Sequence, residues 1–579
     1  MIDIMKYYYK HICGLLFLAL VAVGCSQDDV AAGDGEGGVG ELTDSYVTLN
    51  FTMAFAGQGT RSNPTGGEEG DGTEAGQETD GTNENEITSA VAFLYQDGAG
   101  VNGDAATPVT PVYFGTVHDA GNSSYKTDPQ QVTLPNGNYH ILVVANPGAD
   151  WWTNPAEPLN LGNVRDHLQE TAWTETDGKY SDFLMSSATD GGEFTLASQP
   201  ESAPLNINVN VERMAARIDY LPVGTITCDD NTGEIDILGA AIVNDYNAGS
   251  YLMKRVADEV DGTTLDYLGD EVAGLNYVID PKTKEGKAST DYKEDTYYPD
   301  IIDKANGYAD PDVWDGFVQE GTEITADDGT KWKRIGYTME NTTPTTADIQ
   351  STNTGVVFKA RFTPAGGTVE GNYDYSGHAT FFSYRGVLYA SMEDVMKAFY
   401  GEEAFNSFDA EINACMTWTD VQTFIDENLN SLDPSGYYGY LTEKVKQGGQ
   451  FSPAGLSWTK FMSDTYGYTN TVASGGTANV SLVKGYHARE KLRPYGVSTY
   501  KDATCYYTWW VKHSNDNDNS KVGPMEYGIV RNNIYKLTVK SVAGLGGDVP
   551  GGTPESGDDI VIHVKVNDWM LLDEEEIIM

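Results

Sequence analysis

One segment near the amino terminus constrains the fold more than any other. Residues 46–56 place an apolar side chain at every second position. Successive side chains of a β-strand point to opposite faces of a sheet, so this period of two predicts a strand with one buried face. A chain that contains it must supply neighbouring strands and a core to cover that face. The apolar positions are Val47, Leu49, Phe51, Met53 and Phe55.

Short strand patterns separated by turn signals follow, and they predict a first β-sandwich over residues 87–223. Strands at this spacing with polar loops are typical of antiparallel sandwiches. One short helix is expected near residues 161–170. The expected strands are 87–95, 112–117, 131–134, 139–145, 205–211 and 216–221.

Residues 224–558 predict a second sandwich, interrupted by an insertion. Its first strand is expected at 235–243, and strand patterns return at 501–512, 527–542 and 559–566. Apolar residues at helical spacing predict helices at 391–400 and 419–429. The fold class is therefore mainly β, with two antiparallel sandwiches and a helical insertion in the second. Residues 559–579 form a separate carboxyl-terminal strand and tail.

The charge of the chain excludes several partners. The net charge is −50, from 36 basic and 86 acidic residues among 579. Nucleic acid and anionic lipid surfaces would be repelled, so neither is expected as a partner. The chain is nevertheless 40% hydrophobic and 11% aromatic, which is enough for packed cores. This composition suits an exported β-protein that stays soluble.

The first 24 residues resemble the signal peptide of a bacterial lipoprotein. Basic residues precede an apolar run that is too short to span a bilayer, and small residues then precede Cys25. The resemblance implies that Cys25 is lipidated and anchors the precursor in the outer membrane. The acidic residues just after Cys25 resemble a tag for the outer surface. The alternative is an ordinary signal peptide in which Cys25 is incidental.

Arg61 is the only lysine or arginine between Lys10 and Lys126. It follows the alternating strand and precedes residues 62–86, which hold eight acidic residues, no basic ones and many glycines. We expect 62–86 to be flexible, and flexible exposed segments are where proteases cut. A trypsin-like protease would therefore cut after Arg61 and separate the strand from the rest. Residues 25–61 form the segment that such a cut would remove.

No pattern of catalytic or metal-binding residues stands out. The eight histidines show no metal-ligand spacing, and with 86 acids, paired carboxylates carry no information. An oxygen-rich run at 515–519 is better interpreted as a hairpin turn than as a calcium site. No cofactor, no metal and no enzyme activity are expected. Cys228, Cys415 and Cys505 are expected to be free thiols, with one disulfide as the alternative.

Four segments resemble the fimbrillin family, the type V pilus subunits of Bacteroidales, and especially its larger minor-fimbrium branch. Each lies in the expected order along the chain, and together with the lipoprotein signal they span nearly all of the mature chain. They are Val211-Glu-Arg-Met-Ala-Ala-Arg217, Tyr337-Thr-Met-Glu-Asn-Thr342, Tyr527-Gly-Ile-Val-Arg-Asn-Asn-Ile-Tyr-Lys-Leu-Thr-Val539 and Val564-Lys-Val-Asn-Asp-Trp569.

The resemblance implies a specific order of export, proteolytic processing and assembly. It implies two transthyretin-like β-sandwiches and a lipidated precursor at the outer surface of the outer membrane. An arginine-specific protease then removes the amino-terminal segment, here by cutting after Arg61. The strand lost is 46–56, and a strand from a neighbouring subunit fills its place, so that copies of the chain and other fimbrial subunits polymerise into an adhesive fimbrium. The receptor stays unknown.

The sequence locates the donor strand less precisely than the cleavage site after Arg61. The resemblance points to the carboxyl terminus, and residues 559–579 are the expected donor region. Their apolar face and the tryptophan that follows it could fill a groove, but these residues could equally belong to the chain's own sheet. The residues concerned are Ile560, Ile562, Val564, Val566 and Trp569.

A second interpretation is a permanently lipid-anchored surface protein. It would be either a glycan-binding lipoprotein or a fimbrial anchor or tip that does not polymerise. The 10 tryptophans and 36 tyrosines could stack on sugars, although strand packing is their commoner use.

Overall fold

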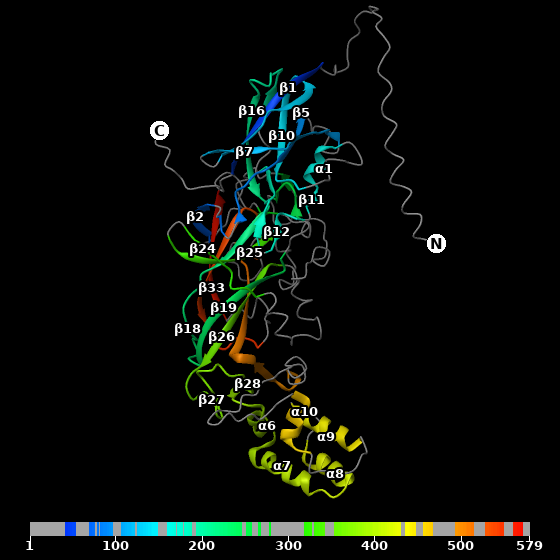
Figure 1. The fold of residues 1–579 in the computed structure, drawn as a ribbon, viewed down its shortest axis with the longest axis vertical. Helices are drawn as coiled ribbons and strands as arrows, with labels where there is room; N and C mark the ends of the chain where they lie inside the picture. The colour runs from blue at the N-terminus through cyan, green and yellow to red at the C-terminus, as the bar shows by residue number, and fades with distance from the viewer. Residues whose placement is uncertain are drawn as a thin grey trace, which may run out of the picture. The chain divides into compact units, whose positions relative to one another are not determined.

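The structure is a computed structural model in which the chain divides after Glu41, and the fold below is that of residues 42–579 (Figure 1). The described residues are 41–53, 69–75, 78–79, 82–96, 106–121, 124–148, 159–169, 171–177, 179–187, 193–245, 250–257, 265–267, 277–278, 318–326, 329–341, 353–429, 433, 435–446, 456–466, 493–513, 527–548 and 560–570. Cys25, Phe55 and Arg61 lie outside them.

A ten-stranded sheet forms the first sandwich, in the order β6-β5-β10-β14-β16-β1-β8-β7, with β15 paired to β10 and β9 to β1. Its strands surround one core, to which β1, β5, β10 and β16 all contribute. The bounds are β1 (Leu42–Met53), β5 (Ala90–Gln96), β6 (Thr110–Phe114), β7 (Val117–Gly121), β8 (Ser124–Thr127), β9 (Gln130–Pro135), β10 (Gly137–Ala145), β14 (Met185–Ser187), β15 (Phe194–Leu196) and β16 (Leu205–Arg213).

Strand β5 is buried on both faces, which explains why its sequence is a continuous apolar run. Ala92 and Leu94 point into the core of the first sandwich. Val91 and Phe93, on the opposite face, belong to a second cluster that includes Leu161 of helix α1 (Leu161–Arg165). Asn160 caps α1 by accepting a hydrogen bond from the backbone N–H of Asn163. The helix is therefore a short cover over this sheet.

Two sheets enclose the core of the second sandwich. One has the order β2-β33-β32-β17-β25-β24, and the other β18-β19-β26-β31. Their shared core is aromatic-rich, with Phe358, Phe362, Tyr507 and Tyr535 almost fully buried. The bounds are β2 (Glu69–Ala75), β17 (Ala215–Tyr220), β18 (Ile226–Thr227), β19 (Gly233–Val243), β24 (Thr322–Thr325), β25 (Lys331–Met339), β26 (Gly355–Pro364), β31 (Thr504–Trp510), β32 (Asn533–Val542) and β33 (Ile560–Met570).

An insertion between β26 and β31 carries the helices. It contains a four-stranded sheet, β27-β29-β28-β30, with β27 to β29 before the helices in the chain and β30 after them. The helices α6 to α10 form one group around their own apolar cluster (Figure 1). The bounds are β27 (Val369–Glu370), β28 (Phe381–Tyr384), β29 (Val387–Tyr389), β30 (Val497–Tyr500), α6 (Met392–Tyr400), α7 (Glu402–Ala414), α8 (Trp418–Asn428), α9 (Tyr437–Lys446), α10 (Trp458–Tyr466), η4 (Arg493–Tyr495) and η5 (Lys501–Ala503).

Short pairs of strands complete the described secondary structure. They are β3 (Glu78–Thr79) with β4 (Thr82–Asn83), β11 (Leu168–Gln169) with β20 (Ser250–Tyr251), β12 (Thr174–Thr176) with β13 (Lys179–Ser181), and β21 (Arg255–Ala257) with β22 (Leu265–Tyr267) and β23 (Tyr277–Val278). Across the ranges given above, no helix has both the length and the apolar composition that a bilayer crossing requires.

The predicted fold class is confirmed: the chain is mainly β, with sandwiches and a helical insertion. Most strand pairs are antiparallel, but β1 with β16, β17 with β32, β2 with β33 and β27 with β29 are parallel. The expected helices at 391–400 and 419–429 correspond to α6 and α8. Helices α7, α9 and α10 were not predicted, although Phe405, Phe408 and Ile412 of α7 do follow helical spacing.

The structure differs from the sequence-based prediction at two segments of the chain. The chain leaves the first sheet at Met214, between β16 and β17, and not near residue 223, because β17 pairs with β25 and β32. Alternation predicts a strand but not the sheet that it joins. The segment 62–86, expected to be flexible, contains β2, which pairs in parallel with β33. Pairing with a neighbour gives this glycine-rich segment a structure that its own composition does not favour.

The three cysteines of the folded part are free thiols. Cys228 and Cys505 are buried, and Cys415 is half-buried. Burial raises the pKa of Cys228 to about 11 and that of Cys505 to about 12. Because the thiolate is the reactive form, these two thiols are inert in the folded protein.

Candidate functional site

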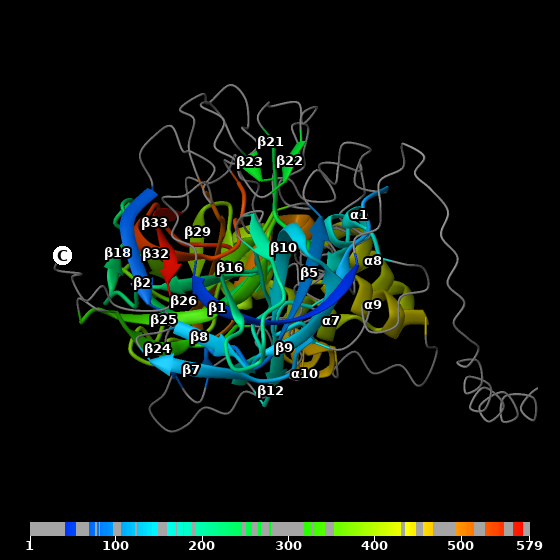
Figure 2. The same ribbon diagram turned by 90° about the horizontal axis from the view of Figure 1, so that it is seen from above.

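Strand β1 lies inside the first sheet, with a neighbour along each edge (Figure 2). On one side it pairs in parallel with β16, from Val47↔Leu205 to Met53↔Val211. On the other side it pairs antiparallel with β9, over residues 42–47, and with β8 at Asn50 and Phe51. We call the positions of β8, β9 and β16 that hold this strand the β1 groove.

The apolar face of β1 is sealed in the core. Val47 is 1% exposed, and Leu49 and Phe51 are fully buried. Full burial of such side chains contributes about 1.5–3 kcal/mol each, so the three together contribute about 5–9 kcal/mol. A typical domain has a net stability of about 5–15 kcal/mol. The first sandwich therefore depends on an occupant in the β1 groove.

Polar contacts fix the register of β1 in its groove. The backbone N–H of Leu49 donates to Thr127 Oγ1 at 2.9 Å, and Ser45 Oγ donates to the Ala197 carbonyl at 2.7 Å. A slip by one residue would turn the apolar face outward and break both bonds. The strand begins at Leu42, four residues before the predicted start, because the backbone of residues 42–45 pairs with β9.

A buried cluster of charged groups centres on Glu84, a residue within the segment that composition predicts to be irregular. Glu84 is fully buried and its carboxylate accepts hydrogen bonds from Arg217 Nη1 at 2.7 Å and from the Tyr337 hydroxyl. Arg217 also donates to Asp219 Oδ2 through two nitrogens, at 3.2 and 3.0 Å. The segment that follows Arg61 is thus anchored to β17 and β25.

Arg213 extends this cluster between the two sandwiches. It ends β16, and its Nε donates to the Glu84 carbonyl at 2.8 Å. Its Nη1 donates to Asn532 Oδ1 at 3.2 Å, while the Asn532 N–H donates to the Ala215 carbonyl at 2.9 Å. Asn532 has φ of +58°, a left-handed conformation that asparagine tolerates better than most residues. This turn brings β32 against the β16–β17 connection.

A second set of buried charges lies around Arg531. Its Nε and Nη2 donate to Glu340 Oε2 at 3.1 and 2.8 Å. Its remaining donors reach the carbonyls of Tyr251 and Leu252, and Ser186 Oγ of β14. Arg531 therefore ties the start of β32 to the first sandwich. We call the Glu84 and Arg531 clusters together the junction network.

Lys254 and Glu212 complete the junction network. Lys254 Nζ lies 3.1 Å from Glu212 Oε2, and both side chains are almost fully buried. Glu212 Oε1 has no hydrogen-bond partner among the described residues. Burial raises the pKa of Glu212, while the charges of Lys254 and Arg531 oppose that shift. These two cations favour the charged form of the carboxylate against the cost of its burial.

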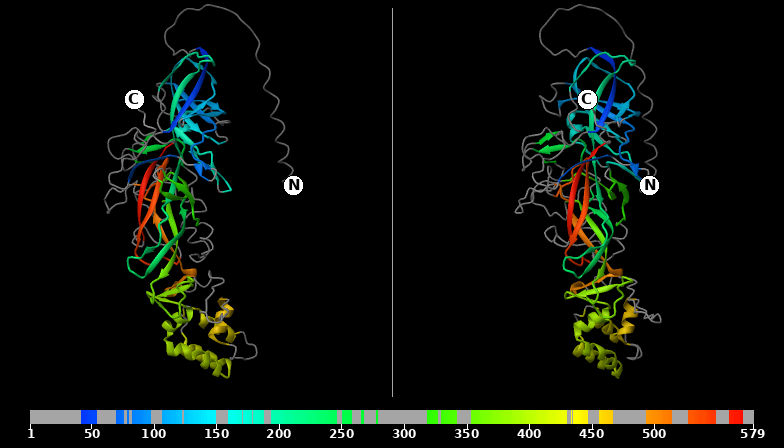
Figure 3. Two further views of the ribbon diagram at one scale, coloured as in Figure 1. Left: turned by 60° about the vertical axis from the view of Figure 1, so that its left-hand side comes forward. Right: turned by 90° about the vertical axis from the view of Figure 1, so that its left-hand side faces the viewer.

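The predicted site residues fall into two groups. Val47, Leu49 and Phe51 line the buried face of β1, and Met53 ends that strand. The candidate donor residues Ile560, Ile562, Val564, Val566 and Trp569 lie on β33, which pairs with β32 from Val542↔Ile560 to Asn533↔Asp568 (Figure 3). Ile562 is half-buried and packs on the second core. In this structure β33 therefore belongs to the chain's own sheet.

Sequence reasoning missed Glu84, Lys254 and Tyr251. Glu84 stands in an acidic run where nothing distinguishes it from its neighbours, and Lys254 lies next to a segment without clear periodicity. Among the residues that the structure describes, no group of three metal-ligating side chains comes together. The site is thus one of packing and strand pairing, built around a buried polar junction.

The motif residues noted in the sequence converge on the junction network. Glu212, Arg213 and Arg217 come from the first motif, Tyr337 and Glu340 from the second, and Arg531 and Asn532 from the third. Residues 498–575, which contain β31, β32 and β33, match the family model described as Major fimbrial subunit protein type IV, Fimbrillin, C-terminal. The carboxyl-terminal part of the chain is therefore similar to fimbrillins.

Solved structures also resemble this chain at low identity. A putative cell adhesion protein from Parabacteroides distasonis ATCC 8503 is 11% identical, with 91% of this chain and 100% of that chain covered and a TM-score of 0.38. A fimbrilin (fimA) from Porphyromonas gingivalis W83 is 13% identical, with 92% and 99% covered and a TM-score of 0.36. The tip fimbrial protein Mfa3 from Porphyromonas gingivalis is 10% identical, with 91% and 100% covered and a TM-score of 0.30. No curated protein matches the chain.

We expect that removing one charge of the buried pair Lys254–Glu212 destabilises the protein, whereas replacing both charged side chains with apolar ones changes its stability little. Lys254→Met leaves the Glu212 carboxylate buried without its cation, and the free energy of unfolding should fall by about 3–5 kcal/mol. The double variant Lys254→Met/Glu212→Leu removes both charges and should recover most of that loss. Urea unfolding of the four forms measures the coupling.

The exposed pair Lys331–Glu323, at 2.6 Å, provides the matched control, and Lys331→Met should leave stability almost unchanged. A double variant that is no more stable than Lys254→Met alone would contradict the structural role given to this pair.

Proposed function

We propose that this protein is a shaft-type fimbrial subunit that polymerises by strand exchange after proteolysis removes β1. The match of residues 498–575 to a major fimbrial subunit supports a structural role in a cell-surface fimbrium that serves adhesion. The cut after Arg61, the lipid on Cys25 and the exchange of strands are the further parts of the proposal.

The position of β1 is the observation that carries this proposal. An edge strand could leave with little consequence, but β1 is paired along both of its edges and seals the first core. Its removal would expose three buried apolar side-chain sites and two rows of unpaired backbone groups. Such a groove accepts an extended strand from another chain, which restores both the hydrogen bonds and the buried apolar surface.

The junction network supports a cut on the amino-terminal side of residue 62. Glu84 holds Arg217 and Tyr337, and it lies downstream of Arg61 in the chain. A cut after Arg61 would therefore remove β1 and leave the junction between the sandwiches intact. It would also release the subunit from Cys25 and its lipid, so that a polymerising subunit need not stay at the outer membrane.

The donor is proposed to come from residues 559–579 of a second copy. Strand β33 supplies a pairing partner to β32 and an apolar contact through Ile562, so its departure would open the second sandwich. Donation by residues after Met570 would leave that sandwich closed. We therefore propose that residues 571–579 enter the β1 groove, with their acidic side chains at its open edge.

The first test replaces the proposed cleavage site. Trypsin treatment of the purified precursor should give one early amino-terminal clip, followed by ladders on a denaturing gel without boiling. Arg61→Ala should abolish both. Arg61→Lys keeps a trypsin site but not an arginine-specific one, so it should still be cut by trypsin and resist an arginine-specific protease. A wild-type chain that is clipped after Arg61 and stays monomeric would favour the anchored or tip protein instead.

The second test weakens β1 without changing the mature chain. Phe51→Ala leaves a cavity in the first core and should destabilise the precursor by about 3–5 kcal/mol. The clipped β1 should then leave its groove sooner, and ladders should form faster than from the wild type. Thr52→Ala, at an exposed position of the same strand, is the matched control and should polymerise at the wild-type rate. Equal rates for all three chains would contradict strand release from the β1 groove.

The third test concerns the donor. A chain that ends at Met570 keeps all of β33 and should fold, as measured by thermal unfolding followed by circular dichroism. After clipping it should remain monomeric, because it has an open groove and no strand to donate. Mixed with clipped wild-type chains it should still be incorporated at one end. Ladders from the truncated chain alone would assign donation to a segment before residue 571.

A further inference from the structure

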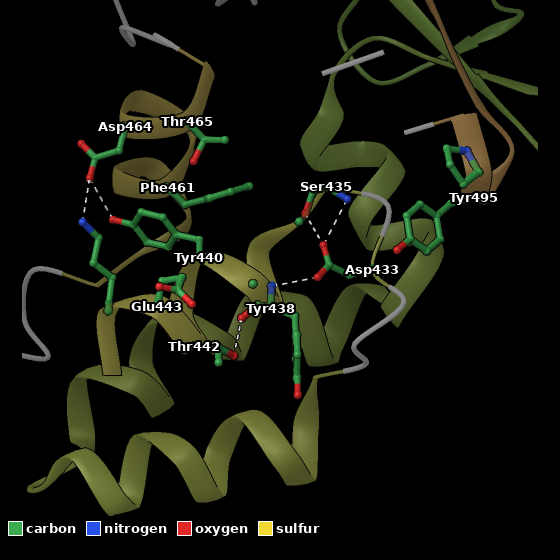
Figure 4. A pocket seen from close by; sticks show the side chains of 14 residues that line it. Asp433, Ser435, Tyr438, Tyr440, Thr442, Glu443, Phe461, Asp464, Thr465 and Tyr495 are labelled. Atoms are coloured by element: carbon green, nitrogen blue, oxygen red, sulfur yellow. Dashed lines mark hydrogen bonds and ion pairs between the residues drawn. The ribbon is translucent and has the colours of Figure 1, made fainter. Parts of the chain in front are cut away.

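A pocket of about 940 Å³ opens in the helical insertion, outside both sandwiches (Figure 4). Its lining comes from α9, α10 and η4, and includes the rings of Tyr438, Tyr440, Phe461 and Tyr495. These rings come from three elements that the chain brings together only on folding. None of its lining residues belongs to the β1 groove or the junction network, so neither of those sites explains it.

The start of α9 is fixed by a buried carboxylate beside the pocket. Asp433 is 2% exposed, and its Oδ1 accepts from the Ser435 hydroxyl at 2.6 Å and from the Tyr437 N–H at 2.8 Å. Its Oδ2 accepts from the Tyr438 N–H at 2.8 Å. These bonds neutralise the first amides of the helix and hold the backbone of Tyr438 in place.

A second part of the lining, around Tyr440, is also held in place by side-chain contacts. The Tyr440 hydroxyl donates to Asp464 Oδ2 at 2.9 Å, and burial together with this bond raises the pKa of Tyr440. The Tyr440 ring packs on Phe461, with ring centroids 5.3 Å apart. Lys444 lies over the same ring at 5.0 Å and within 3.9 Å of Asp464. The pocket is therefore shaped before any ligand arrives.

Two other rings have free polar ends. Tyr438 and Tyr495 are half-buried, and neither hydroxyl has a hydrogen-bond partner among the described residues. The exposed hydroxyl of Thr465 at the rim is likewise without one in the described part of the chain. Aromatic faces with hydroxyls at their edges suit a ligand that is apolar on one face and hydroxylated at its rim.

The charges of the lining argue against an ionic ligand. Asp433 is satisfied by backbone and hydroxyl donors, and Asp464 is paired with Lys460 and Lys444. An anion would meet the carboxylates of Asp433, Glu443 and Asp464 in a chain of net charge −50, and a cation would have to compete with the lysines already in place. A neutral ligand meets neither obstacle.

We propose that this pocket binds a neutral saccharide, with Tyr438 and Tyr495 as the rings that contact its C–H faces. The hydroxyls of these two tyrosines and of Thr465 hydrogen-bond to the hydroxyls of the sugar. The site is independent of strand exchange, because it lies in the insertion between β26 and β31. Each copy in a filament would carry one such pocket.

Full-length protein should be applied to an array of neutral oligosaccharides that end in galactose, mannose or N-acetylglucosamine, with sialylated and sulfated glycans as charged comparators. Any hit is then titrated by saturation-transfer NMR. Tyr438→Ala and Tyr495→Ala should each weaken binding of a neutral glycan about tenfold, as loss of one stacking ring would do. Tyr438→Phe keeps the ring and should lose less.

Tyr113→Ala is the matched control, because Tyr113 is a 54% exposed tyrosine on β6 and not part of the pocket. It should bind like the wild type. Circular dichroism melting of every variant separates lost binding from lost folding. No binding to any neutral glycan, equal binding by all variants, or binding confined to the charged glycans would each overturn the proposal.

Discussion

The buried junction network is the constraint on which the rest of the structure depends. Glu84, Arg213, Arg217 and Arg531 are almost completely buried, in a chain with only 36 basic residues against 86 acidic ones. Buried charges add little net stability when paired, but an unpaired one is severely destabilising. The network therefore permits one arrangement of β16, β17, β25 and β32, in which every arginine finds its carboxylate or carbonyl. The network therefore contributes more to selecting this arrangement of the strands than to the net stability of the protein.

The β1 groove and the junction network stabilise the fold through different kinds of contact. The network holds the β16–β17 connection against β32, and β16 is also the parallel neighbour of β1. One wall of the groove is thus fixed by polar contacts that do not involve β1. Loss of β1 removes apolar contacts that a second strand can restore, whereas loss of Glu84 would remove a charge partner that no incoming strand supplies. This separation is what lets one strand be exchangeable in an otherwise fixed sandwich.

The sequence predicted the type of each local element better than the sheet that the element joins. Alternation over 46–56 identified β1 and its buried face, and helical spacing identified α6 and α8. It placed the end of the first sandwich near residue 223, because nothing local shows that β17 pairs with β25 and β32. The motifs at 211–217, 337–342 and 527–539 indicated a resemblance to fimbrillins, but their convergence on one buried cluster depends on contacts between residues hundreds of positions apart.

By itself, the sequence determined the mainly β class, the apolar face of the first strand and the lone arginine after it. These properties follow from the order of side chains along the chain, which the period of a strand converts directly into one buried face. Only the tertiary structure decided that β1 is an inner strand, that Glu84 is a buried ion-pair partner, and that β33 pairs with β32. Each of these depends on which backbone edge or charge lies opposite, and long-range packing alone brings those partners together.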